Sequence, residues 1–233
     1  MSEKIYAWML KLYPAHFRQE YEASAMQLFR DRLRAERGFF GRLRFWLDVI
    51  ADLAVSVPRE HWRQTALHPA AAVAMTRNDH VPHTELKRGF WRYITQSRRA
   101  IFFARYEASQ TGSGFIEPEH LLLGILRSDE ELALRLFKTK ENIESIGRQV
   151  RTTFPFRRKI SISVDLPLSF ECKRMLAYGA EEAERRNARY IEPQHLLLGL
   201  LRDENCAVAK IMLERGVVAS FLEKPDPGGP RLW

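Results

Sequence analysis

An internal repeat constrains the fold of this chain more than any other feature of its sequence. Residues 107–127 read EASQTGSGFIEPEHLLLGILR, and residues 182–202 read EAERRNARYIEPQHLLLGLLR. The two segments align without a gap, and 12 of the 21 positions are identical. Weaker similarity extends the first copy to about residues 100–137 and the second to about 175–212. This pattern indicates a tandem duplication, in which each copy folds as one unit and packs against the other.

Each copy is predicted to be helical. A first helix ends at a turn containing residues that readily adopt a left-handed backbone, namely Gly112, Gly114 and Asn187. A Glu-Pro pair then opens a second helix. Pro118 and Pro193 suit its first turn, because no backbone N–H is needed there. Both copies therefore predict a pair of helices joined by a short turn.

The second helix of each copy carries three consecutive leucines and then a glycine. The leucines at 121–123 and 196–198 are predicted to face the core. Gly124 and Gly199 lie inside a helix, where glycine costs about 1 kcal/mol relative to alanine. Because both copies keep the glycine, we expect another helix to cross closely at each one.

The chain as a whole divides into four segments. Residues 1–66 are predicted to form amphipathic helices, with one break at Pro14 and the last helix ending before Pro58. Residues 67–87 are interpreted as a linker, residues 88–217 hold both copies, and residues 218–233 form a Pro/Gly-rich tail. The sequence thus predicts an all-α protein in which a helical module precedes a tandem-repeat helical domain.

Composition limits the function. Hydrophobic residues make up 45% of the chain and charged residues 28%, as in an ordinary globular protein. The two cysteines, Cys172 and Cys206, lack the close spacing of a zinc site and are interpreted as small apolar side chains. No catalytic triad, phosphate-binding loop or metal-ligand pattern occurs, so we expect no enzymatic activity, cofactor or metal. Without a visible signal peptide or membrane-spanning run, we expect a cytoplasmic protein.

The repeated motif [FY]-I-E-P-x-H-L-L-L-G-[IL]-L-R resembles the Clp N-terminal domain, also called the Clp repeat domain, over about residues 88–217. That resemblance implies about eight helices with pseudo-twofold symmetry between the copies. It also implies a non-catalytic, chaperone-related module that binds an unfolded or peptide substrate or an adaptor protein and passes it to a Clp-type ATPase. The ATPase modules themselves have no counterpart in this sequence. Protein recognition is therefore the predicted function.

The same resemblance supplies candidate protein-binding residues beside each helix-opening proline: Glu119, His120, Gln194 and His195. The groove between the two copies, near Glu119 and Gln194, is the expected binding surface. In some relatives the acid before the histidine of each copy helps to bind phosphorylated arginine. Only Glu119 keeps that acid, and a neutral amide cannot pair with a guanidinium as a carboxylate does. A symmetrical two-site phosphoarginine reader is therefore not expected. Each histidine is also interpreted as a structural hydrogen-bonding group near its helix start.

Two other kinds of partner remain open. The net charge of +8 and the basic residues at 148–159 suit nucleic acid, although the spread of charge along the chain makes that partner the less expected one. Residues 1–66 resemble the prefix domain that precedes some bacterial ABC-type permeases. That resemblance implies association with a permease, or peripheral contact with a membrane. In this second view, a helix carrying Phe45 and Trp46 with Arg42 and Arg44 lies on a membrane surface.

Tryptophans on helical patterns are interpreted as core residues rather than parts of a cofactor site. They are Trp8, Trp46, Trp62 and Trp91.

Overall fold

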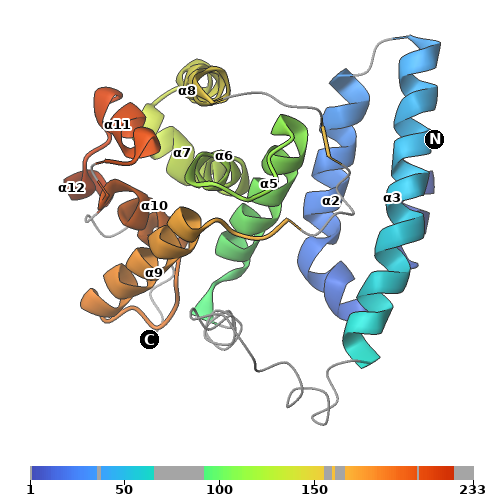
Figure 1. The fold of residues 1–233 in the computed structure, drawn as a ribbon, viewed down its shortest axis with the longest axis horizontal. Helices are drawn as coiled ribbons and strands as arrows, with labels where there is room; N and C mark the ends of the chain where they lie inside the picture. Colours follow the sequence, from blue (N-terminus) through green and yellow to red (C-terminus); the bar gives the residue numbers. More distant parts are fainter. Residues whose placement is uncertain are drawn as a thin grey trace. The chain divides into compact units, whose positions relative to one another are not determined.

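The computed structural model describes residues 2–35, 38–65, 92–154, 159–160, 166–203 and 205–222 (Figure 1). These residues are helical, as the sequence predicts, and their only β-type pairing consists of two isolated bridges. The helices fall into two compact units, α1 to α3 and α5 to α12. The predicted linker, Trp91, the side chain of Trp62 and residues from 223 onward lie outside the described residues. Of the predicted tail at 218–233, residues Ala219–Leu222 form a short helix. No helix in the described part of the chain is long and apolar enough to cross a membrane.

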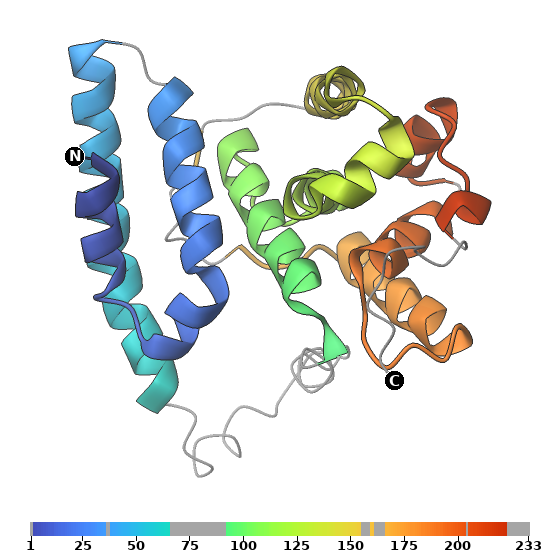
Figure 2. The same ribbon diagram turned by 180° about the vertical axis from the view of Figure 1, so that it is seen from behind.

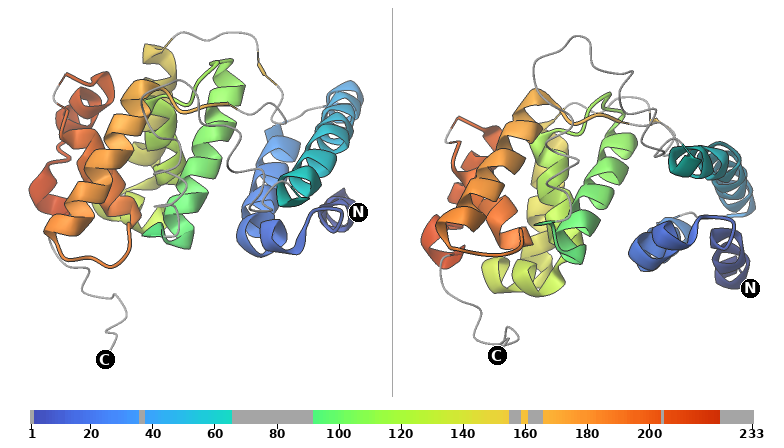
Figure 3. Two further views of the ribbon diagram at one scale, coloured as in Figure 1. Left: turned by 60° about the horizontal axis from the view of Figure 1, so that its bottom comes forward. Right: turned by 90° about the horizontal axis from the view of Figure 1, so that it is seen from below.

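The first unit consists of α1 (Ser2–Leu10), α2 (Ala15–Ala35) and α3 (Phe39–Thr65). The right-hand view of Figure 3 looks nearly along these helices and shows them around a common centre. That centre is a small cluster of buried apolar residues: Phe29, Phe45, Val49 and Leu53. Aromatic rings contribute much of the packing, since Tyr6 of α1 stacks on Phe29 of α2 with their centroids 4.3 Å apart.

Two expectations for this unit were wrong. Helix α3 continues through Pro58 to Thr65 instead of ending before the proline. A proline removes one intrahelical hydrogen bond, but the rest of this 27-residue helix keeps its own bonds. In addition, Trp8 is not a core residue, because its neighbours Tyr6 and Met9 face the cluster while Trp8 is 64% exposed. Helical periodicity places position 8 on a different face from positions 6 and 9.

The second unit contains the duplicated helices, with the first copy in green to yellow and the second in orange to red (Figure 2). The first copy comprises α5 (Thr95–Thr111), α6 (Pro118–Ser128), α7 (Glu130–Phe137) and α8 (Lys140–Thr153). The second comprises α9 (Phe170–Arg185), α10 (Pro193–Leu201), α11 (Ala207–Glu214) and the short α12 (Ala219–Leu222). The leucines at 121–123 and 196–198 lie in one shared core, as predicted.

The two copies exchange short backbone pairings across their interface. The N–H of Ile116 in the first copy donates to the carbonyl of Pro167, and the N–H of Ser169 donates back to Ile116. At the equivalent positions of the other pairing, the N–H of Ile191 donates to Arg92, and that of Ile94 donates to Ile191. In each copy, the segment that precedes the first helix thus pairs with an isoleucine of the other copy. The two pairings are related by the pseudo-twofold symmetry of the unit.

The predicted close helix crossings are confirmed. A Cβ added to Gly124 in α6 would lie 2.1 Å from the carbonyl oxygen of Ala100 in α5. A Cβ added to Gly199 in α10 would lie 2.3 Å from the carbonyl oxygen of Met175 in α9. Glycine is therefore required at both positions, because only hydrogen leaves room for the backbone of the crossing helix.

Candidate functional site

The Glu-Pro pair that opens α6 and α10 fixes how the next two side chains point. Glu117 and Glu192 are the N-caps, and the prolines occupy the first helical turn. The following residues, Glu119 and Gln194, are half-buried, whereas the histidines after them are buried. Each helix start therefore presents one polar side chain near the surface and directs the next one inward.

The structure places Glu119 and Gln194 in two separate pockets rather than in one groove. The Glu119 pocket combines the first turn of α6 with the start of α11 from the other copy. The Gln194 pocket combines the first turn of α10 with α7 from the other copy, so the two sites are related by the pseudo-twofold symmetry. The Glu119 pocket, of about 170 Å³, is lined by Pro118, Glu119, Phe154, Glu171, Arg174, Met175, Asp203, Asn205, Cys206, Ala207 and Val208. The Gln194 pocket, of about 110 Å³, is lined by Ile94, Asp129, Glu131, Leu132, Arg135, Glu192, Pro193 and Gln194.

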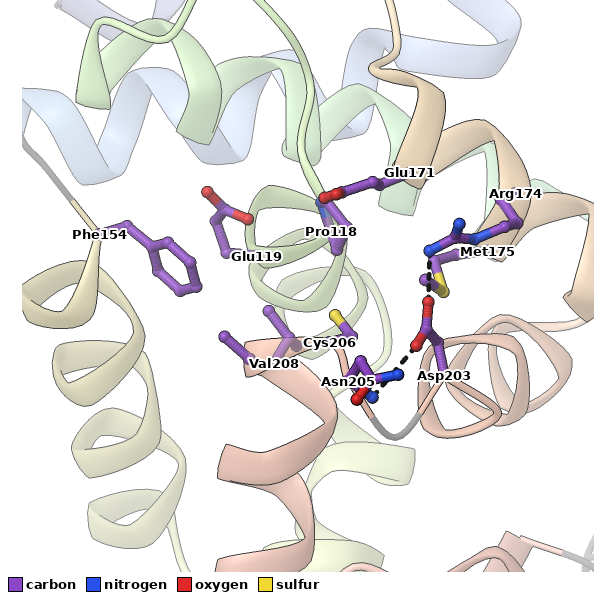
Figure 4. Close-up of a pocket in the computed structure, with 11 residues that line it drawn as sticks. Pro118, Glu119, Phe154, Glu171, Arg174, Met175, Asp203, Asn205, Cys206 and Val208 are labelled. Carbon is purple, nitrogen blue, oxygen red and sulfur yellow. Dashed lines mark hydrogen bonds and ion pairs between the residues drawn. The ribbon is translucent and has the colours of Figure 1, made fainter.

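The Glu119 pocket has an excess of negative charge. Figure 4 shows the carboxylates of Glu119 and Glu171 on one side of the pocket, while Arg174 and Asp203 form an ion pair with each other on the other. Burial raises the pKa of Glu119 to about 7, and the charges of Glu117 and Glu171 add to the increase, while a hydrogen bond from its own backbone opposes it. Glu119 therefore carries a proton through much of the range in which an exposed glutamate is ionised.

Apolar side chains complete this pocket. Phe154, Met175 and Val208 line it opposite and beside the carboxylates (Figure 4). Cys206 also contributes its thiol, and burial raises the pKa of that thiol, so it is not an activated nucleophile. The pocket therefore combines an apolar lining with two acidic groups, which suits a side chain with an aliphatic stem and a cationic head.

The Gln194 pocket differs in its chemistry. The Nε2 of Gln194 donates a hydrogen bond to the Glu192 carboxylate at 2.9 Å, so this amide is occupied by its own helix cap. Glu131 and Leu132 stand at the repeat positions that Cys206 and Ala207 fill in the other pocket. The duplication has therefore left two pockets of related geometry that are lined by different side chains.

His120 and His195 lie beneath these pockets and hold the helix starts. Each is only 2% exposed, and each Nδ1 accepts the backbone N–H of its N-cap glutamate at 3.0 Å. The Nε2 of His120 also lies 2.8 Å from the Thr111 hydroxyl. Burial lowers the pKa of both imidazoles to about 4. The structural role expected for these histidines is confirmed, and little of either ring is open to a partner.

These histidines predict a specific loss of stability in acid. Their folded pKa of about 4 lies below the unfolded value of 6.5, so stability is fully present above pH 6.5 and falls as the pH drops toward 4. In the double variant His120→Gln and His195→Gln, the glutamines can still accept the cap N–H but cannot take up the proton. As the pH falls over that range, the free energy of unfolding should decrease in both proteins. We expect the decrease in the variant to be smaller by about 1–2 kcal/mol for each replaced histidine. Urea unfolding across the pH series measures this, and parallel curves for both proteins would contradict it.

Sequence patterns missed most of the residues that surround Glu119. Phe154, Glu171, Arg174 and Asp203 come from three different places in the chain, and no local spacing connects them to the motif. The constant offset between the two copies is the one signal that relates the two pockets, but it does not reveal which copy completes which pocket. Among the described residues, no group of three or more His, Cys, Asp or Glu side chains is placed to hold a metal ion.

The chain is similar in sequence to known Clp proteins. The chain is 29% identical over 132 residues to the chloroplastic ATP-dependent Clp protease ATP-binding subunit ClpA homolog of Brassica napus. It is also 29% identical over 132 residues to the chloroplastic chaperone protein ClpC1 of Arabidopsis thaliana. Each match covers 56% of this chain but only 15% and 14% of those relatives, so the chain spans a small part of their length.

Two solved structures are similar to part of this chain. The N-terminal domain of the chaperone ClpD from Arabidopsis thaliana has a TM-score of 0.48 and 24% identity, covering 57% of this chain and 90% of that domain. The Hsp104 N-terminal domain from Candida albicans has a TM-score of 0.43 and 16% identity, covering 54% and 83%. At the level of the family, residues 92–215, which are more than half of the chain, match the Clp repeat (R) N-terminal domain. The chain therefore belongs to the Clp repeat N-terminal domain family.

Proposed function

We propose that this chain is a non-catalytic protein-recognition module whose Glu119 pocket binds a basic side chain of a partner segment. The observation that carries the proposal is the uncompensated acidity of that pocket. Arg174 already pairs with Asp203, whereas no ion pair joins Glu119 or Glu171 to a basic side chain within the described part of the chain. Two carboxylates beside an apolar lining are a poor environment for an anion and a good one for a cation.

The volume of the Glu119 pocket suits one inserted side chain rather than a folded element of the partner. A cavity of about 170 Å³ has room for the stem of an arginine or lysine against Phe154, Met175 and Val208. The cationic head then reaches Glu119 and Glu171, and hydrogen bonds to charged groups contribute about 1.5–3 kcal/mol when they are desolvated. Because the rest of the segment stays outside the pocket, an extended or unfolded peptide is the partner we propose. A Clp-type ATPase that takes over such a segment would be a second partner.

A direct test compares two short fluorescein-labelled peptides that differ only in having arginine or its neutral isostere citrulline at the central position. By fluorescence anisotropy we expect the chain to bind the arginine peptide about tenfold more tightly. Glu119→Gln should remove that difference. Glu131→Gln, at the rim of the Gln194 pocket, is the matched control and should preserve it. Equal affinity for both peptides, or an unchanged preference in Glu119→Gln, would refute the proposal.

The pH dependence of the same measurement adds an independent check. With a pKa of about 7, Glu119 is mostly protonated at pH 6 and mostly ionised at pH 8. Because only the ionised carboxylate attracts a guanidinium, the preference for arginine should increase as the pH rises through this range. Glu119→Gln should show no such increase, since an amide does not titrate.

A further inference from the structure

The three-helix unit leaves a set of large apolar side chains outside its core. Helix α1 and the turn after it expose Ile5, Trp8 and Leu12, and helix α3 exposes Leu43, Leu47 and Ile50. Their exposed fractions range from 48% for Leu43 to 64% for Trp8. We call these six residues the outer apolar stripes. The other exposed large apolar side chains among the described residues belong to the duplicated unit.

The stripes follow helical periodicity and are separate from the core-facing positions. Positions 5, 8 and 12 share one face of α1 and its continuation, as positions 43, 47 and 50 do on α3. The core is instead filled from neighbouring faces by residues such as Met9, Phe45 and Val49. Phe45 belongs to the core and not to the stripes, because its ring is 2% exposed and packs on Phe29 and Trp46.

The charges around the stripes have one sign. Lys4 and Lys11 are exposed on α1 and just after it, and Arg42 and Arg44 are exposed at the start of α3. On a helical wheel Lys4 and Lys11 border the α1 stripe, next to Trp8.

Two acidic residues of these helices are paired with arginines of α2. Glu3 bonds Arg30 of α2 at 3.0 Å, and Asp48 lies 3.6 Å from Arg32 of α2. Both acidic side chains point toward α2, on faces of their helices other than the faces that carry the stripes. The surface around the apolar side chains is therefore basic.

We infer that this face binds an anionic lipid surface, with the outer apolar stripes inserted at the headgroup boundary and the flanking cations on the lipid charges. An exposed tryptophan among aliphatic side chains, bordered by lysine and arginine, is the composition that peripheral membrane helices use. A self-associating face would place these cations against the same cations of a second copy, which is unfavourable. The charge pattern therefore favours a lipid surface over a second copy of the chain.

Co-sedimentation of the full chain with vesicles tests this inference. One set of vesicles contains phosphatidylcholine alone, and the other contains equal parts of phosphatidylcholine and phosphatidylglycerol. We expect binding only to the anionic set, with a loss of affinity of at least about tenfold in the double variant Trp8→Ser and Leu47→Ser. The double variant Lys4→Gln and Lys11→Gln should lose about fivefold for each charge removed, and added salt should have the same effect.

Matched controls keep the outcome interpretable. Phe170 is 66% exposed in the other unit, and Phe170→Ser removes the same kind of side chain without touching the stripes. It should bind vesicles as the unchanged chain does. All substituted positions are exposed, so circular dichroism should show an unchanged fold.

Three outcomes overturn the inference: absence of binding to anionic vesicles, equal binding to both sets, and a loss in Phe170→Ser that matches the loss in the stripe variant. A concentration-dependent dimer in light scattering that disappears in Trp8→Ser and Leu47→Ser would also overturn it, by assigning the face to self-association.

Discussion

Replacing Gly124 by alanine is expected to lower the free energy of unfolding of the duplicated unit by about 3 kcal/mol or more. The new Cβ would lie 2.1 Å from the Ala100 carbonyl oxygen and 2.7 Å from the Ala104 backbone nitrogen. Both are backbone atoms of α5, so no side-chain rotation relieves the overlap and the two helices must separate. Separation would reduce the packing of the leucines at 121–123, which face the same core. Urea unfolding followed by circular dichroism, with hydrogen exchange of peptides from α5 and α6, measures the loss.

The chain offers two graded controls for this variant. Gly114 has no atom within 4 Å of an added Cβ and does not need a left-handed backbone, so Gly114→Ala should leave stability within about 0.5 kcal/mol. Gly179→Ala should be milder than Gly124→Ala, because the equivalent position in the first copy is Ala104 and its methyl group is accommodated. If Gly124→Ala is as stable as Gly114→Ala, the close approach of α5 and α6 does not exist in solution.

The glycines also illustrate what sequence reasoning could establish. A helix-disfavouring residue that recurs at the same place in two copies predicts a local steric requirement, and both crossings have it. The Leu triplets and helix-opening prolines are similarly local signals, and they were enough to predict the first two helices of each copy. The exchanged pairings of Ile116 and Ile191 are different, because two similar copies give no indication of which one completes the other. For that reason the sequence suggested one groove near Glu119 and Gln194, whereas the structure places these two residues in separate pockets.

For two further residues, Arg151 and Trp8, the contacts in the structure differ from what their sequence context suggested. Arg151 belongs to the basic run that suggested a nucleic-acid partner, yet its guanidinium bonds the buried carboxylate of Glu107 on α5. Trp8 was interpreted as a core residue because it lies on a helical pattern, although its position on α1 faces away from the cluster. The Arg151 contact joins two segments far apart in the chain, which periodicity within a single helix does not reveal. The exposure of Trp8 follows from its position on the helix relative to Tyr6 and Met9.

Glu107 is the centre of a buried ionic network that joins three helices. This side chain of α5 belongs to a residue only 3% exposed. One carboxylate oxygen accepts from Arg127 of α6 at 3.1 Å, and the other accepts from Nη2 of Arg151 of α8 at 3.0 Å. The guanidinium of Arg127 also lies over the rings of Phe103 and Tyr106, at 5.3 and 5.2 Å from their centroids. The network therefore ties α5, α6 and α8 of the first copy together.

Replacing Glu107 by alanine is expected to cost about 3–5 kcal/mol of the free energy of unfolding. The loss arises because the guanidinium of Arg127, whose side chain is 20% exposed, would stay desolvated without its carboxylate. Glu107→Gln should cost less, since the amide keeps the shape and one hydrogen-bond acceptor. Glu130→Ala is the matched control, because Glu130 and Lys140 form an exposed pair with side chains 66% and 70% accessible. Such surface pairs contribute about 1 kcal/mol at most.

A double-mutant cycle locates the energy within the network. The side chain of Arg151 is 48% exposed, whereas that of Arg127 is 20% exposed. We therefore expect the coupling free energy of Glu107 with Arg127 to exceed that of Glu107 with Arg151. The salt dependence should separate the two in the same way, because a solvent-exposed pair is screened and a buried one is not. If Glu107→Ala lowered the free energy of unfolding no more than Glu130→Ala does, the buried carboxylate would not contribute to stability. Apolar packing alone would then hold α5, α6 and α8 together.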